Sequence, residues 1–222
     1  MLYDLYCIQS MNLGESDAEM NIGFGGGINM CEKENAIYFN AGINQSSMSS
    51  LINKLKILES NILRKQKKLK RKLSDMVDED KHPGFDISIE PKPIMLYITS
   101  NGGYIYQVFA AIDTIKALKV PVHTVCKGFV ASAGTLLSLA GKKRFITENS
   151  YMLIHEMRAG TWGKYSQMVE EMENGKGLME HIRDYYVKNT KMTAEELDEQ
   201  LKRDVCWNAA KCLEKGLVDA II

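Results

Sequence analysis

The pattern of apolar and polar positions in the first part of the chain predicts a strand followed by a long helix. Residues 36–39 form a short apolar run that is typical of a strand. Between residues 51 and 76 apolar side chains recur at helical spacing, and a serine within residues 46–49 can cap this helix. We expect the helix to continue to about residue 77.

From Ile94 onward the pattern alternates between strands and helices. Strands are predicted at residues 94–98, 120–126, 145–146 and 151–154, and helices at residues 108–118, 132–140, 165–189 and 209–215. Thr193 and Glu196 have the spacing of a capping box at the start of one more helix. This alternation predicts an α/β fold with a largely parallel sheet and helices on both of its faces, in a single domain over residues 1–222.

Charge narrows the range of partners. Lys and Arg number 28, as do Asp and Glu, so no global field favours nucleic acid or a membrane. Residues 64–72 are strongly basic and residues 75–80 are acidic, which predicts a solvated helical face. Partner docking is the main alternative for this stretch, and nucleic acid is a minor one because no aromatic residue interleaves with the lysines.

Residues 1–34 are weakly patterned, and their glycines at positions 23–27 predict a flexible loop or a hairpin turn. The five cysteines are odd in number and none has a CxxC spacing, so neither a disulfide framework nor a zinc site is expected. Cys126 lies in an apolar run and is predicted to be a buried strand thiol. The first residues lack the pattern of a secretory signal and no stretch is apolar enough to span a bilayer, so we expect a cytoplasmic location.

Ser132 is the first candidate for chemistry. It lies in the segment Gly-Phe-Val-Ala-Ser-Ala-Gly, residues 128–134, between a predicted strand and a predicted helix. Small neighbours let the backbone bend sharply, leave the hydroxyl uncovered and place it near free N–H groups that favour an oxyanion. A helix cap or close helix packing is the alternative interpretation of this segment.

Three further positions could complete a site. His155 follows an apolar strand, where its imidazole could accept a serine proton, although a lone histidine is more often structural. The pair Gly102-Gly103 follows another strand and could turn an N–H toward a substrate, or be an ordinary tight turn. A carboxylate is needed to orient the histidine, and spacing alone does not separate the acidic candidates Asp184, Asp198, Asp204 and Asp219.

Together these residues resemble the Clp protease proteolytic subunits, the ClpP family. The resemblance runs from about residue 36 to residue 222, and its blocks in order are residues 37–44, 96–103, 128–134, 144–155 and 204–219. Each block is weak alone, but five in register are specific.

The resemblance implies a ClpP/crotonase-type α/β spiral of ββα units with a protruding handle helix at residues 160–189. It implies Ser132 as the nucleophile, His155 as the base and Asp204 as the orienting acid. The backbone N–H groups of Gly103 and Ala133 would hold the oxyanion. Two stacked heptameric rings would form a tetradecamer, and an AAA+ unfoldase such as ClpX or ClpA would feed it unfolded polypeptides using ATP. The peptidase itself would need neither a cofactor nor a metal.

The chain also departs from the family pattern. Asn101 stands where the family has a loop proline, and Glu156-Met157 replace Gln-Pro after the histidine. Residues 1–35 do not resemble the family's gating segment, and residues 61–93 contain a charged helical insertion. We hypothesise that this insertion alters or blocks docking of a standard unfoldase. Such departures are typical of a divergent member of the family, for which a viral origin is one option.

Two other functions remain open from the sequence. A crotonase-type acyl-CoA enzyme shares the fold and the two-amide oxyanion hole, but does not need Ser132, His155 and Asp204 together. A non-catalytic ring subunit or virus-assembly scaffold is the second, although such subunits usually lose a triad member.

Overall fold

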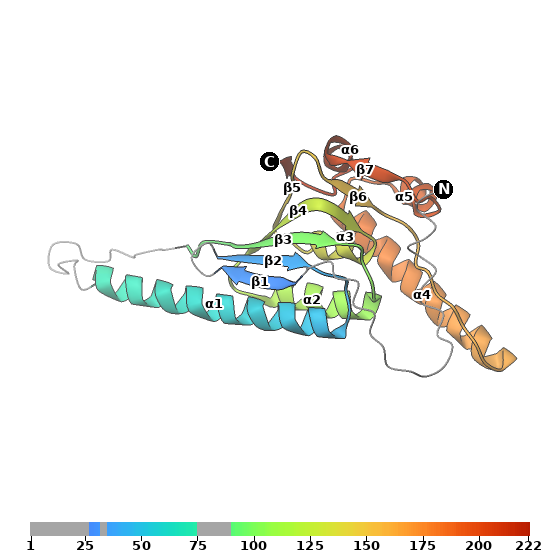
Figure 1. Cartoon of the computed structure of the whole chain (residues 1–222), viewed down its shortest axis with the longest axis horizontal. Coiled ribbons are helices and arrows are strands. Elements are labelled where there is room, and N and C mark those ends of the chain that lie inside the picture. The colour runs from blue at the N-terminus through green and yellow to red at the C-terminus, as the bar shows by residue number, and fades with distance from the viewer. Residues whose placement is uncertain (1–26, 32–34, 75–89) are drawn as a thin grey trace.

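The computed structural model describes residues 27–31, 35–74 and 90–222 (Figure 1). The strands are β1 (Ile28–Cys31), β2 (Ala36–Asn40), β3 (Ile94–Ser100), β4 (Val122–Ala131), β5 (Lys143–Ile146), β6 (Tyr151–Leu153), β7 (Cys206–Asn208) and β8 (Ala220–Ile221). The helices are α1 (Gln45–Ser74), α2 (Ile105–Ala117), α3 (Ala133–Ser138), α4 (Tyr165–Asn189), α5 (Ala194–Leu201) and α6 (Ala209–Glu214). The chain is thus a mixed α/β protein.

The sheet has the order β1-β2-β3-β4-β5-β8 and is parallel except where β1 meets β2. Strand β4 is long and divides the sheet. Its first half, from His123 to Cys126, pairs with β5, and its second half, from Phe129 to Ala131, pairs with β6. Strand β7 then adds antiparallel to β6. The end of β4 and the two strands beside it therefore form a small separate edge.

The hydrophobic core lies between one face of the sheet and helices α1, α2 and α3, and it continues to buried residues of α4, α5 and α6. Ile94, Leu96 and Ile98 of β3 are fully buried on this face, whereas the residues between them are only partly buried. On the second face Tyr38 and Tyr97 stack with ring centroids 4.8 Å apart. Among the described residues, therefore, helices cover only one face of β2 and β3, whereas the sequence predicted helices on both faces. Right-handed crossovers that always step in the same direction along a sheet return each helix to the same side.

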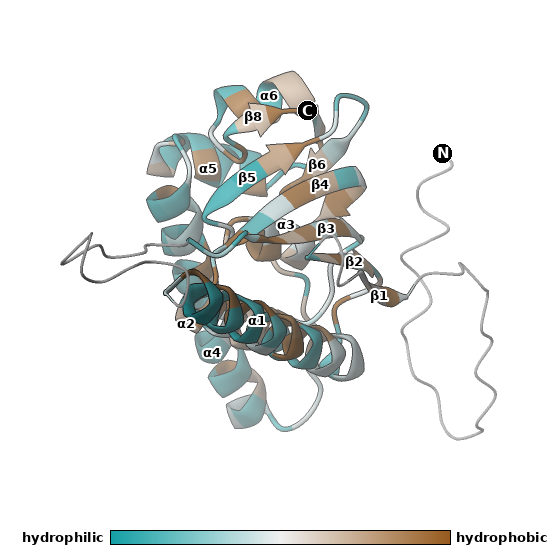
Figure 2. Cartoon of the chain, turned by 90° about the vertical axis from the view of Figure 1, so that its left-hand side faces the viewer, coloured by the Kyte–Doolittle hydropathy of each residue, from teal (hydrophilic) through white to brown (hydrophobic). Residues whose placement is uncertain are grey.

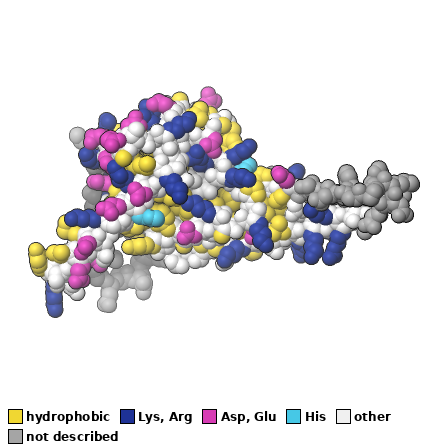
Figure 3. Space-filling model, turned by 180° about the vertical axis from the view of Figure 1, so that it is seen from behind, with side chains coloured by type: hydrophobic (Ala, Val, Ile, Leu, Met, Phe, Trp, Pro, Cys, Tyr) yellow, Lys and Arg dark blue, Asp and Glu magenta, His cyan; other side chains and the backbone are white. Residues whose placement is uncertain are grey.

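Helix α1 is longer than the core that it covers. Asn44 and Ser47 cap it reciprocally, since each side chain accepts the other's backbone N–H, at 2.9 and 3.0 Å. Ile62 is its last buried residue, and the helix continues to Ser74 with an end that is largely hydrophilic (Figure 2). Lys and Arg side chains gather on this far end (Figure 3). They include Arg64, Lys67, Lys68, Arg71 and Lys72.

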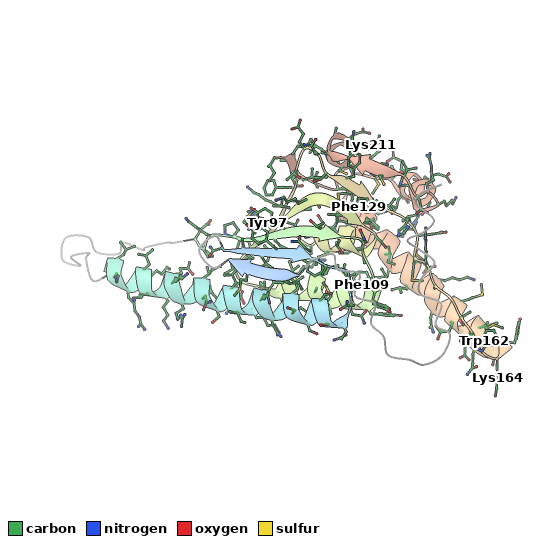
Figure 4. All side chains as sticks on the ribbon, viewed as in Figure 1. Tyr97, Phe109, Phe129, Trp162, Lys164 and Lys211 are labelled. Carbon is green, nitrogen blue, oxygen red and sulfur yellow. The ribbon has the colours of Figure 1, made fainter. Side chains whose placement is uncertain are left out.

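Helix α4 also leaves the body of the molecule and points away from it (Figure 1). Its bounds agree with the predicted helix at residues 165–189. Trp162 and Lys164 lie at its far end (Figure 4), and the Trp162 side chain is 99% exposed. Among the described helices none is both long and apolar enough to cross a bilayer.

Several boundaries differ from the prediction. Strands β1, β7 and β8, with 4, 3 and 2 residues, have no predicted counterpart because such short segments show no clear alternation. Helix α3 is shorter than predicted and begins after Ser132. The capping box of Thr193 and Glu196 is confirmed at α5. The glycines at positions 23–26 and the acidic stretch at 75–80 lie outside the described residues.

Candidate active site

Ser132 occupies the single residue between β4 and α3. Its backbone has φ 54° and ψ −127°, and besides Asn35 it is the only described non-glycine residue with positive φ. Such a conformation costs about 1–3 kcal/mol in a residue with a Cβ and persists only where its surroundings impose it. Here β6 holds it, because the Ser132 N–H donates to the carbonyl of Leu153 at 2.8 Å. The chain therefore turns sharply at Ser132, as it does at the nucleophile of strand–turn–helix hydrolases.

The glycine pair packs against this turn. A Cβ added to Gly102 would lie 2.7 Å from the Ser132 Cβ and 2.8 Å from the Ala131 carbonyl oxygen. A Cβ added to Gly103 would overlap the carbonyl oxygen of Ile43. Both glycines have positive φ, 92° and 144°, so this close approach needs glycine on conformational and on steric grounds.

Two backbone N–H groups near Ser132 have no acceptor among the described residues. Within the described ranges, neither the Gly103 N–H nor the Ala133 N–H donates to a protein acceptor. Ala133 is the first residue of α3 and has no intrahelical acceptor. Gly103 is held by its neighbours, since the Ile43 N–H donates to the Gly102 carbonyl and the Tyr104 N–H donates to the Ile43 carbonyl. Free backbone N–H groups near a serine are the kind of donor that an oxyanion hole uses.

His155 and Asp204 meet at the edge formed by β6 and β7. The pairing of these strands sets Tyr151 opposite Asn208 and Leu153 opposite Cys206. Extending this antiparallel register by two residues sets His155 opposite Asp204. The histidine Nδ1 and the Asp204 Oδ1 are 2.8 Å apart. This contact assigns the Nδ1 proton to the hydrogen bond and leaves Nε2 able to accept a proton.

Two residues that sequence reasoning missed support this pair. The buried Gln200 side chain donates to the carbonyl of Ile154 at 3.3 Å and to that of Val205 at 3.4 Å. It thereby joins the residue before His155 to the residue after Asp204. Arg158 donates from Nη2 to the second carboxylate oxygen of Asp204, at 2.7 Å. Neither residue has a local sequence signal, because both act on segments 46 positions away.

The charges around Asp204 keep it ionised. The hydrogen bond from His155 is the main cause that lowers the pKa of the Asp204 carboxyl, and the Arg158 charge lowers it further. In contrast, burial raises the pKa of the Cys126 thiol to about 12, and also that of Cys212 to about 12. These two cysteines are therefore unsuited to be nucleophiles. Cys126 is fully buried in β4, which confirms the prediction of a buried strand thiol.

The structure brings the predicted triad and the two predicted oxyanion residues to one region, but Ser132 and His155 are not hydrogen-bonded to each other. Ser132 and His155 follow neighbouring strands, and no hydrogen bond joins the Ser132 hydroxyl to the His155 ring in the described part of the chain. A cavity of about 540 Å³ near Arg144 and Lys191 contains none of these residues.

A comparison with protein families identifies the family of this fold. The model of the Clp protease family matches residues 85–222, which include Gly103, Ser132, His155 and Asp204. The match begins after α1, so the expected likeness of residues 37–44 to the family's first strand lies outside it. Because the match covers more than half of the sequence and the fold is a mixed α/β fold with a parallel sheet, the chain belongs to the Clp protease family of peptidases.

Proposed function

We propose that this chain is a ClpP-type serine endopeptidase in which Ser132 is the nucleophile, His155 the general base and Asp204 the orienting acid. The observation that carries the proposal is the 2.8 Å contact between His155 and Asp204 at the strand edge beside the strained Ser132. A histidine that is oriented by a carboxylate and has Nε2 uncommitted is equipped to activate a neighbouring hydroxyl.

The proposed reaction proceeds in two halves. In the first, His155 Nε2 takes the proton of Ser132 as Oγ attacks the scissile carbonyl carbon, and the oxyanion accepts hydrogen bonds from Gly103 and Ala133. The proton then passes to the leaving amine, the C–N bond breaks and an acyl-enzyme remains. In the second half water attacks the ester, His155 takes its proton and returns it to Ser132, and the acid product leaves. No cofactor or metal takes part in these steps.

We further propose that α4 serves assembly into a barrel of two stacked heptameric rings. Tyr165, Val169 and Met172 share one side of this helix and are 79%, 45% and 63% exposed, with the Trp162 ring beyond them. Exposed apolar side chains gathered on a protruding element are typical of a protein interface. Closure of the sites within a barrel would restrict substrates to unfolded polypeptides and short peptides.

An AAA+ unfoldase such as ClpX or ClpA would supply such polypeptides by using ATP. The basic end of α1 beyond Ile62 extends past the core and supports the hypothesis that residues 61–93 alter or block this docking. Deletion of residues 61–80 should then change the stimulation of protein degradation by an unfoldase while turnover of short peptides continues. Unchanged stimulation would contradict the hypothesis.

The first test is cleavage of a fluorogenic short peptide by the purified chain, by Ser132→Ala and by Ser46→Ala. Ser46 is an exposed serine of α1 and provides the matched control. We expect turnover by the natural chain and by the control, and a loss of several orders of magnitude in Ser132→Ala. Equal turnover in Ser132→Ala would exclude Ser132 as the nucleophile.

A non-catalytic ring subunit or assembly scaffold is a second candidate, favoured by the missing hydrogen bond between Ser132 and His155. Absence of turnover and of fluorophosphonate labelling at Ser132 would support it. A crotonase-type activity would instead be indicated by turnover of a CoA thioester that survives Ser132→Ala.

A further inference from the structure

The carboxylate of Asp204 is shared between two cationic or ionisable partners. Its Oδ1 contacts His155 Nδ1 at 2.8 Å and its Oδ2 accepts from Arg158 Nη2 at 2.7 Å. Arg158 lies in the segment between β6 and α4, three residues after His155. The proposed function accounts for Ser132, His155 and Asp204, but it gives Arg158 no role.

An arginine in this place has two physical effects on the pair. Its hydrogen bond fixes one carboxylate oxygen, which leaves the other aimed at the histidine. Its positive charge offsets part of the negative charge that Asp204 presents to His155, so the imidazolium form gains less from the aspartate. The Arg158 and Asp204 side chains are 58% and 56% exposed, so solvent weakens this charge effect but does not abolish it.

The other charged residues near His155 and Asp204 are paired with one another or lie on the neighbouring segments. Lys202 is paired with Glu199 at 2.9 Å, and Glu156 acts on Lys202. The titratable or charged residues on the segments around the pair are Glu156, Glu199, Lys202, Arg203 and Cys206. Besides its contact with His155, the Asp204 carboxylate forms an ion pair with Arg158, whose charge also acts on it.

We propose that Arg158 is a positioning residue of the site, which acts through Asp204 to orient the carboxylate and to weaken its hold on the protonated form of His155. The proposal rests on the function proposed above. It predicts that removal of the Arg158 charge changes the pH dependence of the reactions of the His155 ring.

The test follows protonation of His155 directly. Diethyl pyrocarbonate modifies the neutral imidazole, so the rate of modification against pH gives the titration midpoint of each histidine after digestion and mass spectrometry. The full chain is compared with Arg158→Gln, which removes the charge, and Arg158→Lys, which keeps it. His181, an exposed histidine on α4, serves as an internal control in the same digests.

We expect the His155 midpoint to rise by about half a pH unit in Arg158→Gln, which is the effect of one solvent-screened charge at close range. The midpoint in Arg158→Lys should stay near that of the natural chain, and His181 should not move. The rise should shrink at 1 M salt, since the Debye length falls to about 3 Å. An unchanged His155 midpoint in Arg158→Gln would overturn the proposal.

Adding Asp204→Asn separates action through the aspartate from direct action. The neutral amide of this variant no longer forms an ion pair with Arg158, so the rise caused by Arg158→Gln should shrink in this background. An undiminished rise would refute action through Asp204.

With peptide substrate, the acid limb of kcat/KM should move with the His155 midpoint. If the natural chain shows no turnover that depends on Ser132, the proposed peptidase is refuted. The modification experiment still decides the role of Arg158 in that case, because it needs no turnover.

Discussion

The backbone at Ser132 is held in a conformation that its side chain disfavours. Its φ of 54° and ψ of −127° lie in a region that glycine adopts more readily than residues with a Cβ. Gly102 packs against the Ser132 Cβ, so the backbone has little freedom to relax. The fold thus holds the residue that carries the candidate hydroxyl in a strained conformation at the junction of β4 and α3. This gives a stability test that does not depend on activity.

We expect Ser132→Gly to be more stable than Ser132→Ala. Both variants lose the hydroxyl, but only glycine relieves the positive φ. The relief of about 1–3 kcal/mol exceeds the roughly 0.5–1 kcal/mol that glycine costs through the unfolded chain, which leaves about 1 kcal/mol in favour of glycine. Denaturant unfolding of the two variants measures the difference, and a more stable Ser132→Ala would show that the turn is not strained.

The ionisation of Asp204 makes its contribution depend on pH. Its folded-state pKa is lowered from 3.8, first by the His155 hydrogen bond and then by Arg158, so the contribution is present above about pH 4. It is lost as the pH falls through the lower folded value. Asp204→Asn should therefore be less stable than the natural chain at pH 7 and should approach it at about pH 3. Unfolding midpoints at the two pH values test this, and a constant difference would contradict it.

At the scale of elements, sequence periodicity predicted the long helices better than the short strands. Helix α4 has the predicted bounds, and the capping box locates the start of α5, because caps and a period of 3.6 are local signals. Strand β7 has three residues and no visible alternation, yet its register with β6 brings Asp204 to His155. The choice of Asp204 among the acidic residues therefore needed the family resemblance. Arg158 and Gln200 could not be predicted, since they act across the fold.

The Arg144 side chain links β5 to the segment that leads into β8. Arg144 donates to both carboxylate oxygens of Asp219 and, from Nη1, to the carbonyls of Asn189 at 2.5 Å and Gly216 at 3.1 Å. A planar guanidinium satisfies these acceptors together, whereas an ammonium group reaches only some of them. The C-terminal ends of α4 and α6 are thereby tied to the sheet edge.

Arg144→Lys should lower the free energy of unfolding by about 2 kcal/mol, because partly buried carbonyls lose their donors. Lys143→Ala, at an exposed neighbour in the same strand, is the control and should change stability by less than about 0.5 kcal/mol. Chemical denaturation compares the two, and equal effects would mean that Arg144 has no special role.

At the scale of the whole molecule, two helices extend beyond a compact body in different ways. The far end of α1 is basic (Figure 3). The side of α4 that bears the exposed residues Tyr165, Val169 and Met172 is apolar. A charged end favours contact with an acidic partner, and an apolar side favours contact with a second copy of the chain. The proposed barrel uses the second of these surfaces.

Val169→Asp should weaken the contact between rings, because it places a charge within the apolar side of α4. If α4 joins the rings, we expect the assembly mass to fall by about half in sedimentation analysis. Glu170→Gln, an exposed neighbour on the same helix, should leave the mass unchanged. An unaltered mass for Val169→Asp would remove α4 from the interface.

The pairing of β8 with β5 has a consequence for biosynthesis. Phe145 and Ile146 find their partners in Ala220 and Ile221, and Arg144 finds its partner in Asp219. Asp204 likewise reaches His155 from a position 49 residues later in the chain. During translation the proposed site therefore stays incomplete until Asp204 has left the ribosome, and the sheet edge until Ile221 has left it. A nascent chain that still lacks Asp204 would be unable to cleave polypeptides emerging beside it.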